Sequence, residues 1–169
     1  GKWLLSFEEE ELLKERLEEF GLPPLPPYIE RRQASDLQNA EDRERYQTCF
    51  ASEPGAIAAP TAGLHFTPEI LSAISKRGID ILEVTLHVGL GTFSSIEVED
   101  IRQHKMHTEF FSVTTQTLEQ LKKYRLNQKK IICLGTTSVR VLETLAQQNF
   151  KVRSGWTDIF IHAPYEFRM

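Results

Sequence analysis

The sequence is poor in cysteine and has no long apolar run. Its two cysteines, Cys49 and Cys133, lie far apart within apolar stretches, so we expect buried thiols in a reducing compartment and neither a disulfide nor a cysteine metal site. No apolar stretch approaches the roughly 20 residues that a membrane-spanning helix needs, and no signal peptide is visible. Hydrophobic residues make up 40% of the chain, enough to form a core. These features predict a cytoplasmic globular protein.

Basic residues are too few to give the chain a positive charge. The formal net charge is -4, which argues against a general nucleic-acid-binding protein. Five basic residues nevertheless follow one another without an intervening acid, and we call them the basic run: Lys122, Lys123, Arg125, Lys129 and Lys130. A charge run is usually a solvated face, but this one is also suited to contact nucleic-acid phosphates.

A proline-rich segment divides the first third of the chain. Residues 3–7 predict a short strand, and residues 8–20 predict a helix that ends at Gly21. Residues 23–27, with the sequence PPLPP, exclude a helix or a central strand and predict an extended connector. Residues 36–50 are polar, with a helix expected towards their end. The predicted divisions of the chain are residues 1–22, 23–54 and 55–169.

Strands and helices alternate from residue 55 onward. Thr67 as N-cap, Pro68 at the first helical position and Gly78 after the end delimit one helix. The other expected helices are residues 115–125 and 138–147, and the expected strands are residues 56–59, 79–88, 109–113, 130–134 and 157–161. Such alternation predicts a layered α/β domain with mostly parallel strand pairing.

Five segments, in their order and spacing, carry a resemblance to a known family. They are LPPYI (25–29), APTAGLHFT (59–67), TLHVGLGTF (85–93), HKMHTE (104–109) and GTTSVR (135–140). Together they resemble S-adenosylmethionine:tRNA ribosyltransferase-isomerases, queuosine-pathway enzymes that modify the wobble base of tRNA. The chain departs from the family pattern at Ser95, where proline is expected, and at Pro164, where glycine is expected.

The resemblance implies both a fold and a reaction. The fold would be an α/β domain with a smaller β-barrel-like domain, of which residues 1–22 would be the tail, in a chain truncated at both ends. The ribosyl group of the co-substrate S-adenosylmethionine would move to 7-aminomethyl-7-deazaguanine in the tRNA anticodon and rearrange to epoxyqueuosine, releasing adenine and methionine. The protein would be a monomer, and the truncated chain alone would turn over slowly or not at all.

This reaction requires proton transfer, for which histidine is suited near neutral pH. His65 and His87 are each expected at the rim of a sheet, where sites usually form. His104, His107 and Glu109 form the densest polar group in the sequence. We predict that these five residues are catalytic, and the alternative is that each holds local structure through hydrogen bonds.

Glycines and hydroxyl side chains predict where a ligand is bound. Gly89 and Gly91 allow close approach of backbone to a ligand, although no helix follows them as a dinucleotide motif requires. Residues 135–140 open a helix, so their donors suit a phosphate or the methionine carboxylate, unless they form only a helix cap with a surface arginine. Asp158 is either edge-exposed or a ligand contact. The predicted binding residues are Thr61, Gly63, Gly89, Gly91, Thr92, Thr136, Thr137, Ser138, Arg140 and Asp158, with the basic run as the predicted tRNA contact.

Two alternatives compete with this interpretation. The spacing of His104, His107 and Glu109 is compatible with zinc, which would make a metal-dependent hydrolase. The basic run by itself would make a non-catalytic RNA-binding fragment. We expect no metal, because residues 98–113 change from a helix-like to a strand-like pattern and the three side chains need not converge. The sulfonium of S-adenosylmethionine would also supply the activation that a metal otherwise provides.

Overall fold

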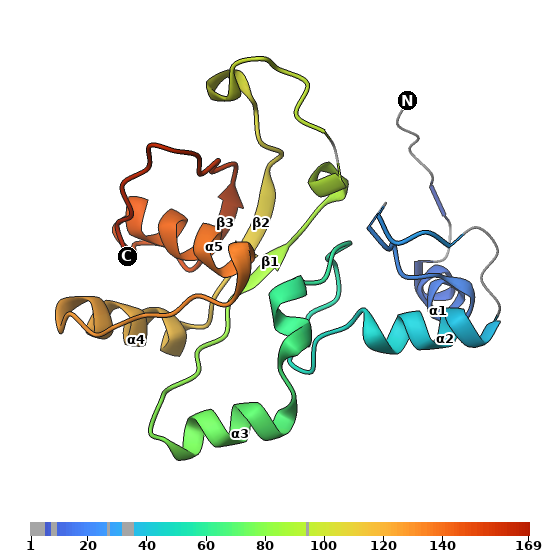
Figure 1. Ribbon diagram of the computed structural model, residues 1–169, viewed down its shortest axis with the longest axis horizontal. Coiled ribbons are helices and arrows are strands. Elements are labelled where there is room, and N and C mark those ends of the chain that lie inside the picture. Colours follow the sequence, from blue (N-terminus) through green and yellow to red (C-terminus); the bar gives the residue numbers. More distant parts are fainter. Residues whose placement is uncertain (1–5, 8–9, 27, 32–35, 94) are drawn as a thin grey trace.

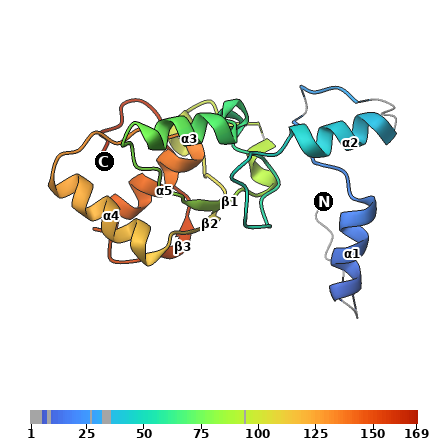
Figure 2. The same cartoon turned by 90° about the horizontal axis from the view of Figure 1, so that it is seen from below.

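The computed structural model describes residues 6–7, 10–26, 28–31, 36–93 and 95–169. In Figures 1 and 2, helices α1 and α2 lie apart from a small sheet, which is accompanied by α3, α4 and α5. None of the described helices is long and apolar enough to cross a membrane. In chain order the elements are α1 (Glu10–Phe20), α2 (Asp36–Arg45), η1 (Thr61–His65), α3 (Pro68–Lys76), β1 (Thr85–His87), η2 (Leu90–Phe93), η3 (Ile101–Gln103), β2 (Glu109–Ser112), α4 (Thr115–Leu126), α5 (Gly135–Gln147) and β3 (Ser154–Thr157), where η marks a 3-10 helix.

The sheet is antiparallel, and the predicted parallel pairing is wrong. Its order is β1-β2-β3, and each neighbouring pair runs antiparallel. Residues 130–134, predicted as a strand, form no regular element, so β2 and β3 are joined through two helices and not through a single-helix crossover. The last strand also begins at Ser154, three residues earlier than predicted, and ends at Thr157. Mixed helix and sheet remains correct, but the parallel layering does not.

The predicted barrel-like region at the N-terminus is not supported. The described part of residues 1–22 contains helix α1 and no strand, and the strand expected at residues 3–7 lies largely outside the described residues. The leucine face of α1 is not covered, since Leu12 is 45% exposed and Leu17 is 59% exposed. The second helix, α2, begins at Asp36, earlier than predicted, and the side chain of Arg43 donates to the backbone oxygen of Gly21 at 2.5 Å.

Helix α3 forms where its capping residues predict it. The Thr67 hydroxyl accepts a hydrogen bond from the backbone N–H of Ile70 at 3.4 Å, and Pro68 occupies the first turn. The apolar side chain of Ile70 on this helix is 42% exposed. The expectation for the cysteines fails in part, because Cys49 is exposed and Cys133 is half-buried, both as free thiols.

The core lies between α5, α4 and one face of the sheet. Helix α5 packs against β1 and β3, and Phe111, Val141 and Leu145 are fully buried there. Each such side chain contributes about 1.5–3 kcal/mol through burial. The strand register gives the sheet two faces. We call the face with Leu86, Glu109, Phe111, Gly155 and Thr157 the inner face, and that with Thr85, His87, Phe110, Ser112, Ser154 and Trp156 the outer face.

Candidate functional site

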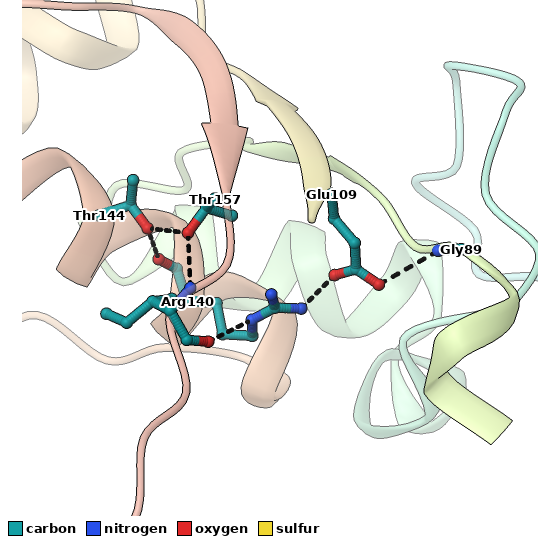
Figure 3. A network of polar contacts seen from close by, with 6 residues as sticks. Gly89, Glu109, Arg140, Thr144 and Thr157 are labelled. Carbon is teal, nitrogen blue, oxygen red and sulfur yellow. Dashed lines mark hydrogen bonds and ion pairs between the residues drawn. The ribbon is translucent and has the colours of Figure 1, made fainter. Parts of the chain in front are cut away.

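A buried ion pair joins the start of β2 to the second turn of α5. Glu109 is only 4% exposed, and its carboxylate Oε2 is paired with Nη1 of Arg140, whose side chain is 12% exposed (Figure 3). The other carboxylate oxygen, Oε1, accepts from the backbone N–H of Gly89 at 3.1 Å. Two segments predicted separately, residues 85–93 and 135–140, therefore meet on one carboxylate.

Further hydrogen bonds hold both the guanidinium and the backbone of Arg140. Its Nε donates to the backbone oxygen of Ile159 at 3.3 Å, just after β3. Its own backbone oxygen accepts from the Thr144 hydroxyl at 2.7 Å. Thr144 also shares a 2.6 Å hydrogen bond with Thr157, whose hydroxyl oxygen accepts from the N–H of Ile159 at 3.3 Å (Figure 3). The guanidinium is thus fixed in place by α5, β2 and the segment after β3.

One donor of this arginine is left over. Arg140 Nη2 is buried and has no hydrogen-bond partner among the described residues. Burying an unsatisfied donor on a charged group is costly, so such a donor calls for an explanation. A guanidinium is well suited to bind a carboxylate or a phosphate oxygen through an unused N–H. Glu109 and Arg140 therefore form a fixed pair in which one buried guanidinium donor has no partner among the described residues.

The glycine loop after β1 is gripped by residues preceding β2. A Cβ added at Gly91 would lie 1.9 Å from Cδ2 of His107, so the imidazole sits directly against the loop backbone. The backbone N–H of Thr92 donates to the oxygen of Gly89 at 3.2 Å and closes the loop. His107 and Glu109 thus line the Gly89–Gly91 loop together, and His107 is also exposed.

Turn η1 lies beside the start of α5. The two elements are in contact, and a Cβ added at Gly135, which has a φ of +81°, would lie 3.7 Å from Cβ of Ala62. Gly63 is required for packing, since an added Cβ would lie 2.6 Å from Cζ of Phe50. Thr61 and His65 are exposed on the same turn. The segments around residues 61–65 and 135–140 therefore form one continuous region.

The predicted anion-binding residues of α5 differ in their availability. The Ser138 hydroxyl donates to the backbone oxygen of Leu134 at 2.9 Å, so its hydrogen is used within its own helix. Thr136 is exposed and Thr137 is half-buried, close to the helix start. Helix α5 has no side-chain N-cap, because Leu134 occupies that position. Its first N–H groups can therefore bind an anion, as at other helix starts.

Four other predicted residues take no part in the contacts of the ion pair described above. His87 lies on the outer face of the sheet and stacks on Phe110 with ring centroids 5.9 Å apart. His104 meets the ring of Phe160 at 4.9 Å. Asp158 is exposed just beyond the end of β3, so its position is not within a strand as expected. Thr92 is likewise exposed, in η2.

The basic run is split among different contacts. Lys122 pairs with Glu119 at 2.8 Å on the surface of α4, and Arg125 donates from Nε to the backbone oxygen of Arg168 at 3.2 Å. The guanidinium of Arg125 also lies over the ring of Phe150, 5.5 Å from its centroid. Lys123, Lys129 and Lys130 are exposed. Their contact with tRNA stays a prediction.

The metal-dependent alternative is not favoured by this geometry. Within the described residues, no three His, Cys, Asp or Glu side chains are grouped as metal ligands. Glu109 is bonded to Arg140 and Gly89, the ring of His104 lies against Phe160, and the ring of His107 lies against the backbone of Gly91. The zinc-compatible spacing in the sequence is therefore not matched by convergence in space.

Sequence reasoning did not select His162 or the buried Glu143. His162 lies against Phe160 with ring centroids 5.4 Å apart. Hydrogen bonds from Arg102 hold the pKa of Asp100 below its usual range, with a smaller contribution from the charge of His162. Glu143 is also buried, one helical turn from Arg140. A glutamate among the apolar residues Val141, Leu142 and Leu145 was the available signal for it.

Comparisons with known proteins find a matching family and similar proteins. The chain matches the family described as "Queuosine biosynthesis protein" over residues 1–169. Proteins named S-adenosylmethionine:tRNA ribosyltransferase-isomerase are similar to it. One from a Sulfurihydrogenibium species is 49% identical over 157 residues, which cover 93% of this chain and 45% of the relative. Those of Staphylococcus epidermidis and Clostridioides difficile are 46% and 43% identical over 99% and 100% of this chain and 48% of each relative. The chain spans about half the length of these curated relatives.

Proposed function

Because the chain belongs to the family of queuosine biosynthesis proteins, we propose that it forms part of an enzyme that transfers the ribosyl group of S-adenosylmethionine to tRNA and isomerises it. The names of its relatives state this reaction. The proposed acceptor is 7-aminomethyl-7-deazaguanine at the wobble position, and the proposed products are epoxyqueuosine in tRNA, adenine and methionine. The single observation that carries the site is the buried Arg140 with a donor left unpaired.

Arg140 is proposed to bind the anionic end of a substrate. Its free Nη2 can donate to the methionine carboxylate of S-adenosylmethionine or to a tRNA phosphate. Glu109 acts as a positioning residue, because it fixes the guanidinium on one side and the Gly89 N–H on the other. The uncapped start of α5, with Thr136 and Thr137, offers a second anion site within the same region.

The protons are proposed to move through the histidines that remain accessible. S-adenosylmethionine, when bound, supplies a sulfonium that acidifies its neighbouring carbons. His107, exposed against the Gly89–Gly91 loop, can take or return a proton there. His65, exposed on η1 beside α5, is the second candidate. The adenine leaves with a proton that one of these groups returns.

Release of adenine tests the proposal. Since the chain matches 48% of the Clostridioides difficile relative, it can replace the matching half of that protein in a chimaera. We expect the chimaera to release adenine from S-adenosylmethionine only when tRNA carrying the deazaguanine base is added. Arg140→Lys should lower the ratio of kcat to KM at least about tenfold, because a lysine cannot make the same two-sided contacts.

Two results would contradict the proposal. One is a chimaera that melts cooperatively, as the parent relative does, yet releases no adenine. The other is transfer of the methyl group instead of the ribosyl group, detected with S-adenosylmethionine labelled on the methyl carbon. Unchanged kinetics in Arg140→Lys would leave the reaction in place but remove this arginine from the site.

A further inference from the structure

The outer face of the sheet carries a continuous row of aromatic rings. His87, Phe110 and Trp156 are direct cross-strand neighbours in β1, β2 and β3. The ring centroids of His87 and Phe110 are 5.9 Å apart at an interplanar angle of 24°, and those of Phe110 and Trp156 are 5.5 Å apart at 69°. The row therefore crosses the whole width of the described sheet. Trp156, at its open end, is 66% exposed.

The rest of this face is polar and not aliphatic. Thr85, Ser112 and Ser154 form a second row beside the rings. A face that is to be covered by the protein's own core is expected to carry Val, Ile and Leu. Rings flanked by hydroxyl groups instead suit a ligand with flat π-faces and hydrogen-bonding edges. Nucleobases with their ribose hydroxyls have both features.

The charge around this face is complementary to a polyanion. Apart from Glu109, the strands β1, β2 and β3 contain no acidic residue, although the chain as a whole is acidic. Glu109 begins β2, but its carboxylate is buried on the inner face with Arg140. Two basic residues, Lys151 and Arg153, are exposed immediately before the edge strand β3; Arg153 lies opposite Val113 in the ladder, in register with the inner face. Asp158 is exposed just beyond the end of β3.

We propose that Phe110 and Trp156 of this row stack unpaired bases of the RNA substrate, while Lys151 and Arg153, exposed just before the edge strand, contact its phosphates. His87 continues the row, but its ring lies against the backbone of Gly55, where an added Cβ would lie 2.6 Å from Nδ1. The inference rests on the proposed function for the identity of the ligand as RNA. Two neighbouring rings offer more surface than a single base covers, which favours an RNA strand over the adenine of free S-adenosylmethionine. Sheets that present aromatic side chains to single-stranded RNA bind successive bases in this manner.

Intrinsic fluorescence isolates this face. The chain has two tryptophans, so Trp3→Phe leaves Trp156 as the only one. In that background, a single-stranded RNA stem-loop should quench the emission of Trp156 and shield it from acrylamide. A fully paired duplex of the same composition and free S-adenosylmethionine should each leave the emission nearly unchanged.

Affinity measured by fluorescence anisotropy with the same labelled stem-loop gives an independent readout. Trp156→Ala should raise the Kd about tenfold, which is about 1.4 kcal/mol, in line with the loss of one stacked base. Trp156→Phe should restore most of the affinity because it keeps a ring. The matched control is Tyr28→Ala, which removes an aromatic side chain that is 76% exposed elsewhere on the chain and should leave the Kd unchanged.

Each contrary result is distinct. Stem-loop binding that is insensitive to Trp156→Ala, without quenching, would overturn the inference while leaving adenine release, and so the proposed function, intact. Quenching by S-adenosylmethionine alone would assign the face to the co-substrate. Shielding of Trp156 in the free chain, together with a dimeric mass in solution, would assign it to a second copy. Absence of any stem-loop binding would also overturn it.

Discussion

Two carboxylates, Glu109 and Glu143, are buried within one small core, but the groups that stabilise them differ. Glu109, 4% exposed, is paired with the guanidinium of Arg140 and with one backbone N–H. Glu143, 1% exposed, accepts from the backbone N–H groups of Arg168 and Met169 at 3.1 Å and from the Tyr165 hydroxyl at 2.9 Å. These donors to Glu143 are uncharged.

The two carboxylates hold different parts of the structure in place. The donors of Glu143 all come from the last residues of the chain, so its carboxylate holds the segment after β3 against α5. Burial and the hydrogen bond to Glu143 raise the pKa of Tyr165, which therefore stays a donor across the neutral range. Glu109 instead fixes a cation that retains a free donor. In this second arrangement a buried donor has no partner among the described residues, and this is the group that we propose to meet a ligand.

Removing the carboxylate of Glu109 should have the largest effect on stability. Glu109→Ala leaves Arg140 buried without its counter-ion, and the free energy of unfolding should fall by about 3–5 kcal/mol. Urea denaturation followed by circular dichroism measures this. Adding Arg140→Met to Glu109→Ala should recover part of the loss, because the unpaired charge is gone. The control Glu119→Ala, at an exposed carboxylate paired with Lys122, should change stability by at most about 0.5 kcal/mol. Equal losses of stability in Glu109→Ala and Glu119→Ala would contradict the buried pairing of Glu109 with Arg140.

Removing the carboxylate of Glu143 should be less costly, because no opposite charge is left behind. Glu143→Ala should lower the free energy of unfolding by about 1–3 kcal/mol through its unsatisfied donors. Amide hydrogen exchange at Arg168 and Met169 should become faster while that of Gly89 is unaffected. Glu143→Gln should retain part of the protection, since its amide oxygen still accepts. Faster exchange at Gly89 would show that the two carboxylates are not independent.

A smaller effect distinguishes the two glycines of the loop beside Glu109. An added Cβ at Gly91 meets His107 at 1.9 Å, whereas one at Gly89 meets nothing within 4 Å. Gly91→Ala should therefore destabilise the chain by about 1–3 kcal/mol through overpacking, and Gly89→Ala should be nearly neutral. Adding His107→Ala to Gly91→Ala removes the ring but keeps its Cβ, 2.8 Å from the added atom, so it should recover part of the loss. The thermal midpoints of Gly89→Ala, Gly91→Ala and the double variant test this. A double variant no more stable than Gly91→Ala would show that the His107 ring is not the cause of the clash.

The smallest predicted effect concerns the reactivity of the two cysteines. Burial, with a smaller contribution from the charge of Glu143, raises the pKa of the Cys133 thiol. Less thiolate is then present at a given pH, so iodoacetamide should modify Cys133 more slowly than the exposed Cys49 at neutral pH. Raising the pH should speed the reaction of Cys133, and Glu143→Gln should speed it slightly. Faster labelling of Cys133 than of Cys49 in the folded chain would contradict its burial.

Local signals in the sequence predicted local structure well. Thr67, Pro68 and Gly78 predicted the bounds of α3 to within two residues, and the helix predicted at residues 115–125 is α4. Pairing partners were not predictable, because alternation of elements does not distinguish one crossover helix from two. The strand expected at residues 130–134 shows this, since Ile132 is 81% exposed. Leu12 and Leu17 of α1 are exposed. The helical pattern predicts an apolar face but not whether another element covers it.

The candidate site was predicted as segments and not as contacts. Glu109 and Arg140 were both selected, but their ion pair depends on β2 and α5 meeting across 31 positions of sequence. Gly89 enters through its backbone N–H, which no sequence pattern reveals. His87 was expected at the rim of a sheet, and the two-residue alternation of β1 and its register with Phe110 place it on the outer face, opposite to Glu109.

The most direct test of the account compares adenine release in two isosteric variants of the chimaera. Glu109→Gln weakens the hold on Arg140, so adenine release in the presence of S-adenosylmethionine and the deazaguanine tRNA should fall at least about tenfold. Glu143→Gln, measured well below its melting temperature, should stay within about twofold of the unsubstituted chimaera. Equal losses in the two variants, or full activity in Glu109→Gln, would contradict the claim that the Glu109–Arg140 pair forms the site.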